Sequence, residues 1–472
     1  MISLMDLAYF AGLGLLSPVW AWRLLRYPQK YRQGWRAKLW GDVPPRESAR
    51  PCLWFHAVSV GEVNLLRPLL VEVERRLPSV DVRLSTTTRS GFEVASKRYA
   101  ALDPFYTPFD WSWAVRRAVA HIRPSVLVLT ELEIWPQLIA EAKNAGARVA
   151  VVNGRLSDRS FRGYRMAMPF LRPTFQRLDA VAAQDQRTAE RFIALGVPSD
   201  RVFVTGSLKF DGAECDRGNP HTQSLRELAR IAHDETVFLA GSTQEGEEAA
   251  ALEVFRRLAP AFPHLRLILV PRHPERFESV AELLRASGLP WLRRSELAPD
   301  RPLPVHWPHG QQPPVQPAFG SQRFVDVLSE TPQQRAFLPV ILVDTVGELS
   351  AWWGLADIAF VGGSFGNRGG QNMLEPAGYG AAVSFGPNTW NFRDIVKALL
   401  EAEAAVVVHD ARELEAFVRR CLEQPDYARS LGQRAQNLVL SHRGATLKTF
   451  EILRRLLSAE EKEEGLKLRR SA

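Results

Sequence analysis

The chain has 472 residues, of which 46% are hydrophobic and 24% charged, and its formal net charge is +8. This composition excludes a largely disordered chain, and the length favours two domains of roughly 200 residues each. The positive charge favours an anionic partner but does not choose among nucleic acid, a membrane surface and a phosphorylated substrate. Cys52, Cys215 and Cys421 lie far apart and form no C-x-x-C pair, which argues against a disulfide framework or a zinc site and fits a reducing compartment.

The amino-terminal segment differs from the rest of the chain. The stretch SLMDLAYFAGLGLLSPVWAW is about long enough to span a membrane, but Asp6, two glycines and Pro18 make its hydropathy marginal. The cations that follow lie beside aromatic residues, as expected next to anionic headgroups: Arg23, Arg26, Lys30, Arg32, Arg36 and Lys38. We expect residues 1–38 to be an uncleaved membrane anchor or in-plane segment, with no signal for secretion. The alternative is a buried first helix followed by a solvated basic turn.

Short apolar runs alternate with helix-like stretches beyond residue 50. The runs are CLWFHAVS, DVRLSTTT, SVLVLTE, ARVAVVNG and AVAAQD, and a second series contains TVFLAGST, LRLILVPR, VILVDTV, DIAFVGGS, AAVSFGP and AVVVHD. This alternation predicts two tandem Rossmann-like domains, each with a parallel sheet wound with helices. Periodicity lapses over residues 208–223, so we place the domains at 39–212 and 213–472. A cleft between the sheets is the expected ligand site.

A proline-rich segment interrupts the second series. Residues 298–320, APDRPLPVHWPHGQQPPVQPAFG, are typical of an extended surface loop inserted between strands. We assign no chemistry to this insertion.

The first predicted strand leads directly into a helix that carries an acid in its first turn. Residues 54–70, WFHAVSVGEVNLLRPLL, turn through Ser59-Val60-Gly61 and place Glu62 at the helix start. A carboxylate there complements the helix dipole, so Glu62 has a structural explanation as well as a functional one.

Glycines cluster late in the chain. No G-x-G-x-x-G follows the first strand and no P-loop is present, so neither NAD nor ATP is indicated. Instead FVGGSFGNRGGQNMLEPAGYG, residues 360–380, predicts a strand, a glycine-rich turn and a helix starting near Asn372, which would direct N–H groups at an anion. The alternative is that Asn372 and Glu375 simply cap the helix.

Eight segments together resemble the Kdo transferases, GT-B glycosyltransferases that transfer 3-deoxy-manno-octulosonic acid from CMP-Kdo to a lipid A precursor. The segments follow the family's order over nearly the whole chain: HAVSVGE, TELEIWP, NGRLSDRSFRGY, TGSLKFD, VPRHPERF, DTVGEL, FVGGSF and GGQNMLEPAGYG. The resemblance implies an α/β fold of GT-B type, whose two Rossmann-like domains face each other across a cleft, with the membrane-associated segment in front.

The resemblance also implies roles for particular residues. Glu62 corresponds to the family's general base. The donor nucleotide and sugar are held by segments that match Pro271, Arg272, Val346, Gly347, Glu348, Asn372, Met373, Leu374 and Glu375.

The placement of several polar residues agrees with these roles. Arg272 ends the predicted strand LRLILVPR, at the carboxyl edge where α/β sheets bind ligands, although a surface salt bridge is the alternative. Glu131 and Glu133 follow another strand, and one of them is expected to face the cleft and place the acceptor or stabilise the transition state. Lys209 could meet negative charge developing on the leaving group, a role that rests mainly on the resemblance.

The chain departs from the family pattern in three places. Met373 replaces a proline, Ser207 replaces an asparagine, and Thr88-Arg89-Ser90-Gly91 stands at a T-P-T-G-like stretch. These departures indicate a divergent member and bear more on the acceptor than on the donor.

The predicted reaction is inverting transfer of Kdo from CMP-Kdo to the lipid A precursor lipid IVA in lipopolysaccharide biosynthesis. Glu62 would deprotonate the acceptor hydroxyl, and Arg272, Lys209 and helix N-termini would neutralise charge. We expect no metal, no cofactor and no nucleic-acid partner, and a location on the cytoplasmic face of the inner membrane. The alternatives are another GT-B sugar-nucleotide transferase or epimerase, and a non-catalytic membrane-surface binding module.

Overall fold

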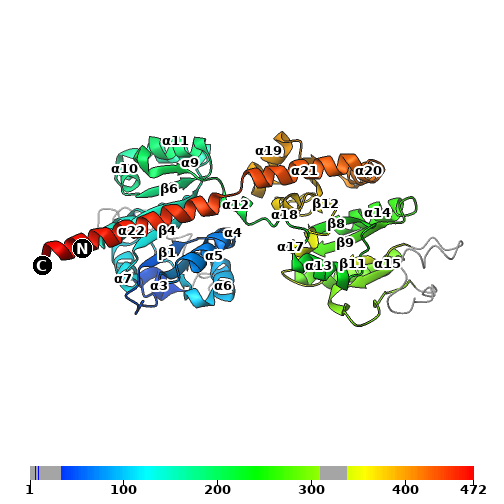
Figure 1. Cartoon of the computed structure of the whole chain (residues 1–472), viewed down its shortest axis with the longest axis horizontal. Coiled ribbons are helices and arrows are strands. Elements are labelled where there is room, and N and C mark those ends of the chain that lie inside the picture. Colours follow the sequence, from blue (N-terminus) through cyan, green and yellow to red (C-terminus); the bar gives the residue numbers. More distant parts are fainter. Residues whose placement is uncertain (1–5, 7–8, 10–32, 309–336, 472) are drawn as a thin grey trace. The chain divides into compact units, whose positions relative to one another are not determined.

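The computed structural model describes Asp6, Tyr9, residues 33–308 and residues 337–471. It divides into two compact units (Figure 1). The first unit runs up to Gly212 and resumes at His442, and the second runs from Ala213 to Ser441.

The first unit is built on a seven-stranded parallel sheet with the order β3-β2-β1-β4-β5-β6-β7. Its strands are β1 (Cys52–His56), β2 (Asp81–Thr86), β3 (Phe105–Tyr106), β4 (Val126–Thr130), β5 (Arg148–Gly154), β6 (Ala180–Ala183) and β7 (Val202–Val204). Its helices are α3 (Trp35–Trp40), α4 (Val60–Leu65), α5 (Arg67–Arg76), α6 (Arg89–Arg98), α7 (Ser112–Ile122), α8 (Pro136–Asn144), α9 (Asp158–Met166), α10 (Met168–Gln176), α11 (Gln186–Ala194), α12 (Leu208–Asp211) and α22 (Ala445–Ser471).

Both faces of this sheet are buried, which explains why its central strands are continuous apolar runs. Cys52 and Trp54 of β1 pack in a cluster with α7, α8, α10 and α11. Leu53 and Phe55 point to the opposite face and pack with α4, α5, α6 and α22. Because side chains alternate along a strand, a strand covered on both faces needs apolar residues at every position.

The second unit repeats the architecture, with the strand order β10-β11-β9-β8-β12-β13-β14 and parallel pairing between neighbours. Its strands are β8 (Thr236–Thr243), β9 (Leu265–Pro271), β10 (Trp291–Arg293), β11 (Val340–Leu342), β12 (Ile358–Val361), β13 (Ala382–Phe385) and β14 (Ala405–Val407). Its helices are α13 (Pro220–Leu228), α14 (Glu247–Leu258), α15 (Phe277–Ser287), α17 (Leu349–Trp353), α18 (Leu374–Gly378), α19 (Arg393–Glu401), α20 (Ala411–Glu423) and α21 (Pro425–Ser441). The predicted α/β class with two tandem Rossmann-like domains is confirmed.

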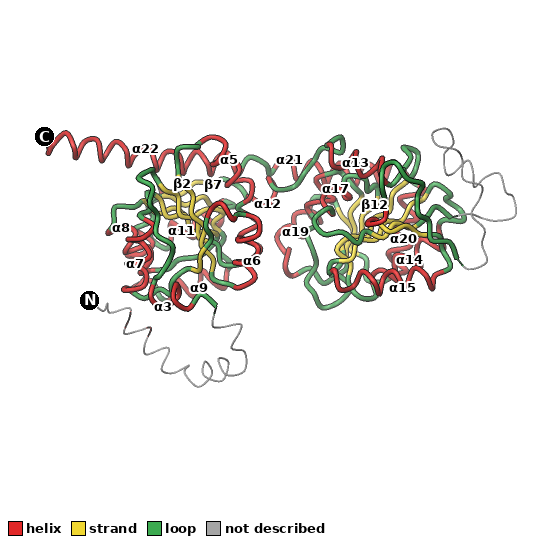
Figure 2. Tube along the Cα trace, turned by 90° about the horizontal axis from the view of Figure 1, so that it is seen from below, coloured by secondary structure: helices red, strands yellow, loops and turns green. Residues whose placement is uncertain are grey.

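The last helix corrects the expected extent of the second domain, 213–472. From His442 onward the chain belongs to the first unit. Phe450, Leu453 and Leu457 of α22 are buried in the core that contains α5, and Figure 2 shows α22 next to α5. Asp211 fixes the start of α22, because its carboxylate accepts hydrogen bonds from the backbone of Gly444 and Thr446.

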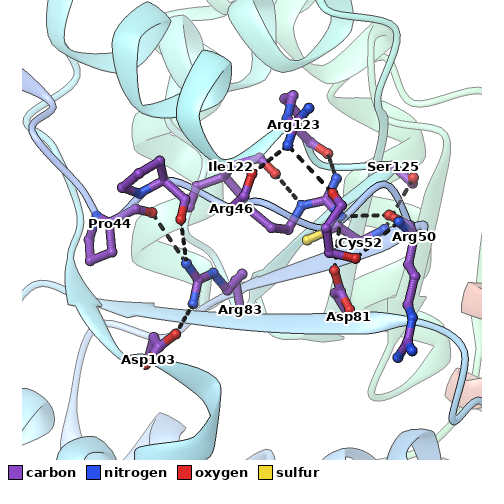
Figure 3. Close-up of polar contacts among 12 residues, drawn as sticks. Pro44, Arg46, Arg50, Cys52, Asp81, Arg83, Asp103, Ile122, Arg123 and Ser125 are labelled. Atoms are coloured by element: carbon purple, nitrogen blue, oxygen red, sulfur yellow. Dashed lines mark hydrogen bonds and ion pairs between the residues drawn. The ribbon is translucent and has the colours of Figure 1, made fainter.

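A polar network fastens the chain that precedes β1 to the amino ends of the first sheet (Figure 3). Arg46 donates to the carbonyls of Arg50, Ile122 and Arg123 and to the carboxylate of Asp81, the first residue of β2. The polar groups at the amino edge of the sheet are therefore bonded to the protein itself. Ligands of open α/β sheets bind at the opposite, carboxyl edge.

Most of the expected membrane segment, residues 1–38, lies outside the described residues. Asp6, which weakened the hydropathy signal, is buried and accepts hydrogen bonds from the backbone and hydroxyl of Ser112, at 2.9 and 2.6 Å. Tyr9 donates to Asp110 at 2.8 Å. Within the described residues, no helix combines the length and apolar composition that crossing a bilayer requires.

The proline-rich insertion, 298–320, is described only as far as residue 308. In that part His306 pairs with Trp291 of β10 through a short antiparallel bridge, and their rings stack with centroids 4.2 Å apart. The rest of the expected loop lies outside the described residues.

Candidate functional site

Three predicted acids lie at the carboxyl edge of the first sheet, where the strand order reverses. β1 and β4 are neighbours although β2 and β3 separate them in sequence, and such a switch point is where open α/β sheets bind ligands. Glu62 follows β1, and Glu131 and Glu133 follow β4. We call these three residues the carboxylate cluster.

Glu62 is both a helix-capping group and a perturbed acid. Its carboxylate accepts hydrogen bonds from the backbone of Val58 and the hydroxyl of Ser59, at 2.8 and 2.9 Å. The Ser59 hydroxyl caps α4 in return by accepting from the Glu62 backbone. Partial burial nevertheless raises the pKa of Glu62, and the charge of Glu131 adds to that rise. The structural explanation for this acid therefore holds without excluding a catalytic one.

Glu133 is the most strongly perturbed acid of the cluster. Burial first, and then the charges of Glu62 and Glu131, raise its pKa to about 7, against a hydrogen bond from the Trp135 indole at 2.9 Å that favours the charged form. Acids with a pKa near 7 and like-charged neighbours are typical of catalytic sites.

Glu131 is held beside Lys209 by a residue to which the sequence assigned no role. Asn153 donates to Glu131 at 3.5 Å, and its amide oxygen accepts from the backbone of Leu208 at 3.0 Å. The Lys209 ammonium lies 3.9 Å from the Glu131 carboxylate. Glu131 and Asn153, whose side chains meet, both adopt positive φ, 57° and 52°, a left-handed backbone conformation that is uncommon outside glycine and often found at functional sites.

His56 is a second residue that the sequence placed near the site without a role. It is fully buried at the end of β1, and its Nδ1 lies 3.1 Å from the Ser85 hydroxyl and 2.9 Å from that of Thr107. Burial lowers the pKa of His56 to about 4, so its ring is neutral at physiological pH. Its Nε2 points towards Glu133, at 4.0 Å. A histidine at the end of a buried strand was the available signal, but sequence shows neither burial nor partners.

The predicted donor residues occupy the carboxyl edge of the second sheet. Arg272 directly follows β9, is exposed, and donates a hydrogen bond to Gln371 at 3.2 Å. Its charge also lowers the pKa of Glu375, against a larger rise caused by burial. The charge of Arg272 is therefore felt at Glu375, although the two residues, at positions 272 and 375, are 103 positions apart in the sequence.

Asn372 and Glu375 bond to each other at the start of α18, much as the capping alternative expected, although Met373 is the N-cap residue. Asn372 donates to the Glu375 carboxylate at 3.0 Å and accepts from the backbone of Leu374 at 3.2 Å, at the start of α18. Met373 and Leu374 are buried, with 0% and 1% of their surface exposed, and Pro271 is buried at the end of β9. The side chains of these three predicted donor residues face the protein interior.

The glycine-rich turn binds an acid of the protein itself. The backbone N–H groups of Gly363, Ser364 and Phe365 all donate to the buried carboxylate of Glu247, at 2.7 to 3.0 Å. Gln244 donates to the same carboxylate at 2.8 Å. The protein's own acid thus takes the anion position, and the turn is held rigid between β8 and β12.

The predicted segment 346–348 is partly structural. Glu348 accepts from Nε and Nη2 of Arg294, at 2.9 and 2.7 Å, and from the Thr345 hydroxyl. Val346 by contrast is 75% exposed, and Gly347 adopts a φ of 96°, which favours glycine. This part of the segment is an exposed turn. Among the described residues, no group of three His, Cys, Asp or Glu side chains is arranged to hold a metal ion.

The sequence of the chain is similar to those of known proteins. Residues 30–212 match the family model described as 3-deoxy-D-manno-octulosonic-acid transferase (kdotransferase). A relative from Bordetella pertussis, named 3-deoxy-D-manno-octulosonic acid transferase, is 32% identical over 94% of this chain and 96% of its own. One of the same name from Haemophilus influenzae is 30% identical over 91% and 92%.

A solved structure extends the likeness to the whole fold. The UDP-GlcNAc 2-epimerase from Neisseria meningitidis matches 86% of this chain and all of its own with a TM-score of 0.51. Its sequence identity is 11%, so this likeness concerns the fold alone. By its sequence and its two Rossmann-like domains, the chain belongs to the Kdo transferase family of GT-B glycosyltransferases.

Proposed function

We propose that the protein transfers Kdo from CMP-Kdo to the lipid A precursor lipid IVA with inversion, using Glu62 as the general base. The observation that carries this proposal is the carboxylate cluster at the switch point of the first sheet, in which Glu62 and Glu133 both have raised pKa values. A Kdo transferase needs one group that accepts a proton from a sugar hydroxyl, and this cluster supplies it.

The two raised pKa values suit different tasks. The carboxylate of Glu62 removes the proton of the acceptor hydroxyl, the hydroxyl oxygen attacks the anomeric carbon of Kdo, and the bond to the CMP phosphate breaks. Glu133, with a pKa of about 7, is partly protonated at neutral pH. Because a protonated neighbour does not repel a charged one, Glu133 allows Glu62 to stay ionised and ready to accept a proton.

We assign one cation of each unit to the binding of negative charge. Lys209 is held at the cluster by the Glu131 carboxylate, 3.9 Å away, and is assigned to transition-state charge. Arg272 is assigned to the donor, because its exposed guanidinium stands at the carboxyl edge of the second sheet.

We further propose that the enzyme works on the cytoplasmic face of the inner membrane. The support for this location is the basic, aromatic sequence of residues 1–38 together with the lipid nature of the proposed acceptor.

The test is to incubate the purified protein with CMP-Kdo and tetra-acylated lipid A precursor and to weigh the lipid products. A product heavier by one or more Kdo residues, with CMP released, is expected. CMP should inhibit and UDP should not, and activity should persist in EDTA. Release of CMP without a Kdo-lipid product, or no turnover with CMP-Kdo, would refute the proposal.

A further inference from the structure

Arg272 is held by its backbone as well as by its side chain. Its guanidinium is exposed and donates to Gln371 at 3.2 Å. Its backbone N–H donates to the carbonyl of Thr243, at 3.0 Å. Thr243 is the last residue of β8, the neighbour of β9 in the second sheet. The position of the Thr243 carbonyl therefore fixes where the segment that carries Arg272 leaves the sheet.

The end of β8 departs from regular strand geometry. Ser242 adopts a φ of 55°, in the left-handed region, and the pairing of β8 with β9 shifts in register between Gly241 and Thr243. A left-handed conformation is uncommon for residues other than glycine and persists where surrounding contacts enforce it. The contacts of Thr243 provide such enforcement.

A buried ion pair holds Thr243 through both its hydroxyl and its carbonyl. Glu248, in the first turn of α14, accepts from the Thr243 hydroxyl at 2.8 Å. It also accepts from two nitrogens of the Arg276 guanidinium, at 2.6 and 2.9 Å. Arg276 in turn donates to the Thr243 carbonyl at 3.3 Å, the same oxygen that accepts from the Arg272 backbone. Because a bidentate pair fixes orientation as well as distance, Glu248 and Arg276 together set the position of this carbonyl.

The same two strands carry a second buried pair of the same chemistry. Arg266 donates through Nε and Nη2 to Glu235, at 2.7 and 2.9 Å, and both side chains are almost fully buried. Glu235 directly precedes β8, and Arg266 is the second residue of β9, so this pair lies at the amino edge of the sheet. A buried ion pair is weak evidence for stability, since apolar residues often replace it without loss. Of the two pairs, Glu248–Arg276 is the one bonded to the strand end that holds Arg272.

We propose that Glu248 and Arg276 are positioning residues of the donor site, which hold the Thr243 carbonyl and thereby place Arg272 where it binds the negative charge of CMP-Kdo. The inference rests on the proposed function, because it takes from it the assignment of Arg272 to the donor. The Glu248 side chain is 2% exposed and its carboxylate already accepts from Arg276 and Thr243. Its loss should therefore weaken donor binding through Arg272, without removing a group that contacts the donor.

The donor affinity of Glu248→Gln tests the inference. Gln is neutral, so Arg276, whose side chain is 19% exposed, can turn to water and release the Thr243 carbonyl. The Kd of CMP-Kdo, measured by calorimetric titration, should rise about tenfold, within the range for residues coupled in one hydrogen-bond network. Arg276→Lys keeps the charge but loses the bidentate geometry, so it should give a smaller rise, and it is the milder variant if Glu248→Gln folds poorly.

Glu235→Gln is the matched control. It breaks a buried pair of the same chemistry on the same two strands, at the opposite edge of the sheet. It should leave the Kd of CMP-Kdo unchanged even where it lowers the melting temperature as much as Glu248→Gln does. Equal weakening of donor binding by the two variants would overturn the inference, because the effect would then follow from general loss of structure.

A double-mutant cycle with Arg272→Ala shows whether Glu248 acts through Arg272. If it does, Glu248→Gln should raise the Kd of CMP-Kdo by less than about twofold in the Arg272→Ala background. A rise of the same size in both backgrounds would overturn the inference, and so would an unchanged Kd in the Glu248→Gln single variant when Arg272→Ala weakens binding.

Amide hydrogen exchange tests the positioning without any donor. Exchange at the Arg272 N–H, which is bonded to the Thr243 carbonyl, should be about tenfold faster in Glu248→Gln than in the wild type or in Glu235→Gln. Unchanged exchange at Arg272 in Glu248→Gln would overturn the inference. Faster exchange together with normal CMP-Kdo binding by Arg272→Ala would count against the donor role of Arg272 in the proposed function, and not against its positioning by Glu248.

Discussion

The imidazole Nε2 of His56 lies 4.0 Å from the carboxylate Oε2 of Glu133, and the usual order of their proton affinities is reversed. The pKa of the buried His56 is about 4, whereas that of Glu133 is about 7. Near neutral pH the ring is therefore neutral, while the carboxyl group of Glu133 is partly protonated. The two residues are not an ion pair, and the burial of the histidine is the reason.

This reversal predicts how stability depends on pH. Because the folded-state pKa of Glu133 lies above the ordinary value of 4.5, its contribution is most favourable below that value and is lost as pH rises through about 7. Glu133→Gln removes this loss, so the variant should melt about 2–6 °C above the wild type at pH 8, with a smaller difference at pH 5. Thermal melts across that range measure it. Glu74→Gln, an exposed change on α5, is the control, and a parallel pH dependence of the wild type and Glu133→Gln would contradict the assignment.

Glu62→Gln separates a base from a capping group. The one amide oxygen of Gln can still accept from the Val58 backbone while its NH2 group donates to the Ser59 hydroxyl. Loss of a charge that only complements the helix dipole costs about 0.3–1 kcal/mol, so the melting temperature should change little. Loss of the general base should lower turnover on the order of 10² to 10⁴. Rates of CMP release with saturating donor and acceptor measure the effect.

The outcome that would reject Glu62 as the base is also defined. A Glu62→Gln enzyme that binds CMP-Kdo and melts normally, yet turns over at more than about a tenth of the wild-type rate, falls outside the range for a lost base.

Arg272→Ala should weaken donor binding. A hydrogen bond to a charged group contributes about 1.5–3 kcal/mol, so the dissociation constant of CMP-Kdo should rise roughly 10- to 150-fold while the melting temperature stays the same. Arg272→Lys should fall between, because an ammonium keeps the charge but loses the planar fork. Calorimetric titration measures both, with Arg412→Ala on α20 as an exposed control in the same unit. An unchanged affinity of Arg272→Ala for CMP-Kdo would show that this arginine does not bind the donor.

Glu247→Ala should destabilise the second unit before it affects chemistry. The change leaves three buried backbone N–H groups and the partly buried one of Phe365 without an acceptor, at a cost on the order of 2–4 kcal/mol. Glu247→Gln should cost less, because an amide oxygen can still accept some of these bonds. Denaturant unfolding of the full chain measures the order of the two variants, and equal stability of Glu247→Ala and wild type would show that the turn does not depend on this carboxylate.

The strands of the sheets could be predicted from the sequence because a strand buried on both faces is a continuous run of mostly apolar residues. The strand Val126–Thr130 is buried at every position and apolar up to its last residue, so it stands out without knowledge of its neighbours. The acids of the carboxylate cluster were also within reach, because strand ends of a parallel sheet meet at one edge.

The rest depended on partners that are distant in sequence. Glu247 precedes the glycine-rich turn by more than 100 residues, so the turn looked like an open anion site. The sequence also does not say which core α22 joins, because apolar residues at helical spacing do not identify their partners. The burial of His56 and its contacts with the hydroxyls of Ser85 and Thr107 arise only in the folded sheet, so its protonation state could not be predicted from the sequence.

The return of α22 to the first unit sets the order in which the chain can fold on the ribosome. Residues 213–441 form a contiguous unit that is fully synthesised while α5 still lacks its partner. The first unit, although begun earlier, keeps the apolar face around Leu69 and Val73 uncovered until Phe450 and Leu453 have emerged. The unit that carries the proposed base is thus the first to be translated and the last to be completed, and a nascent chain stalled before α22 exposes a surface that chaperones would bind.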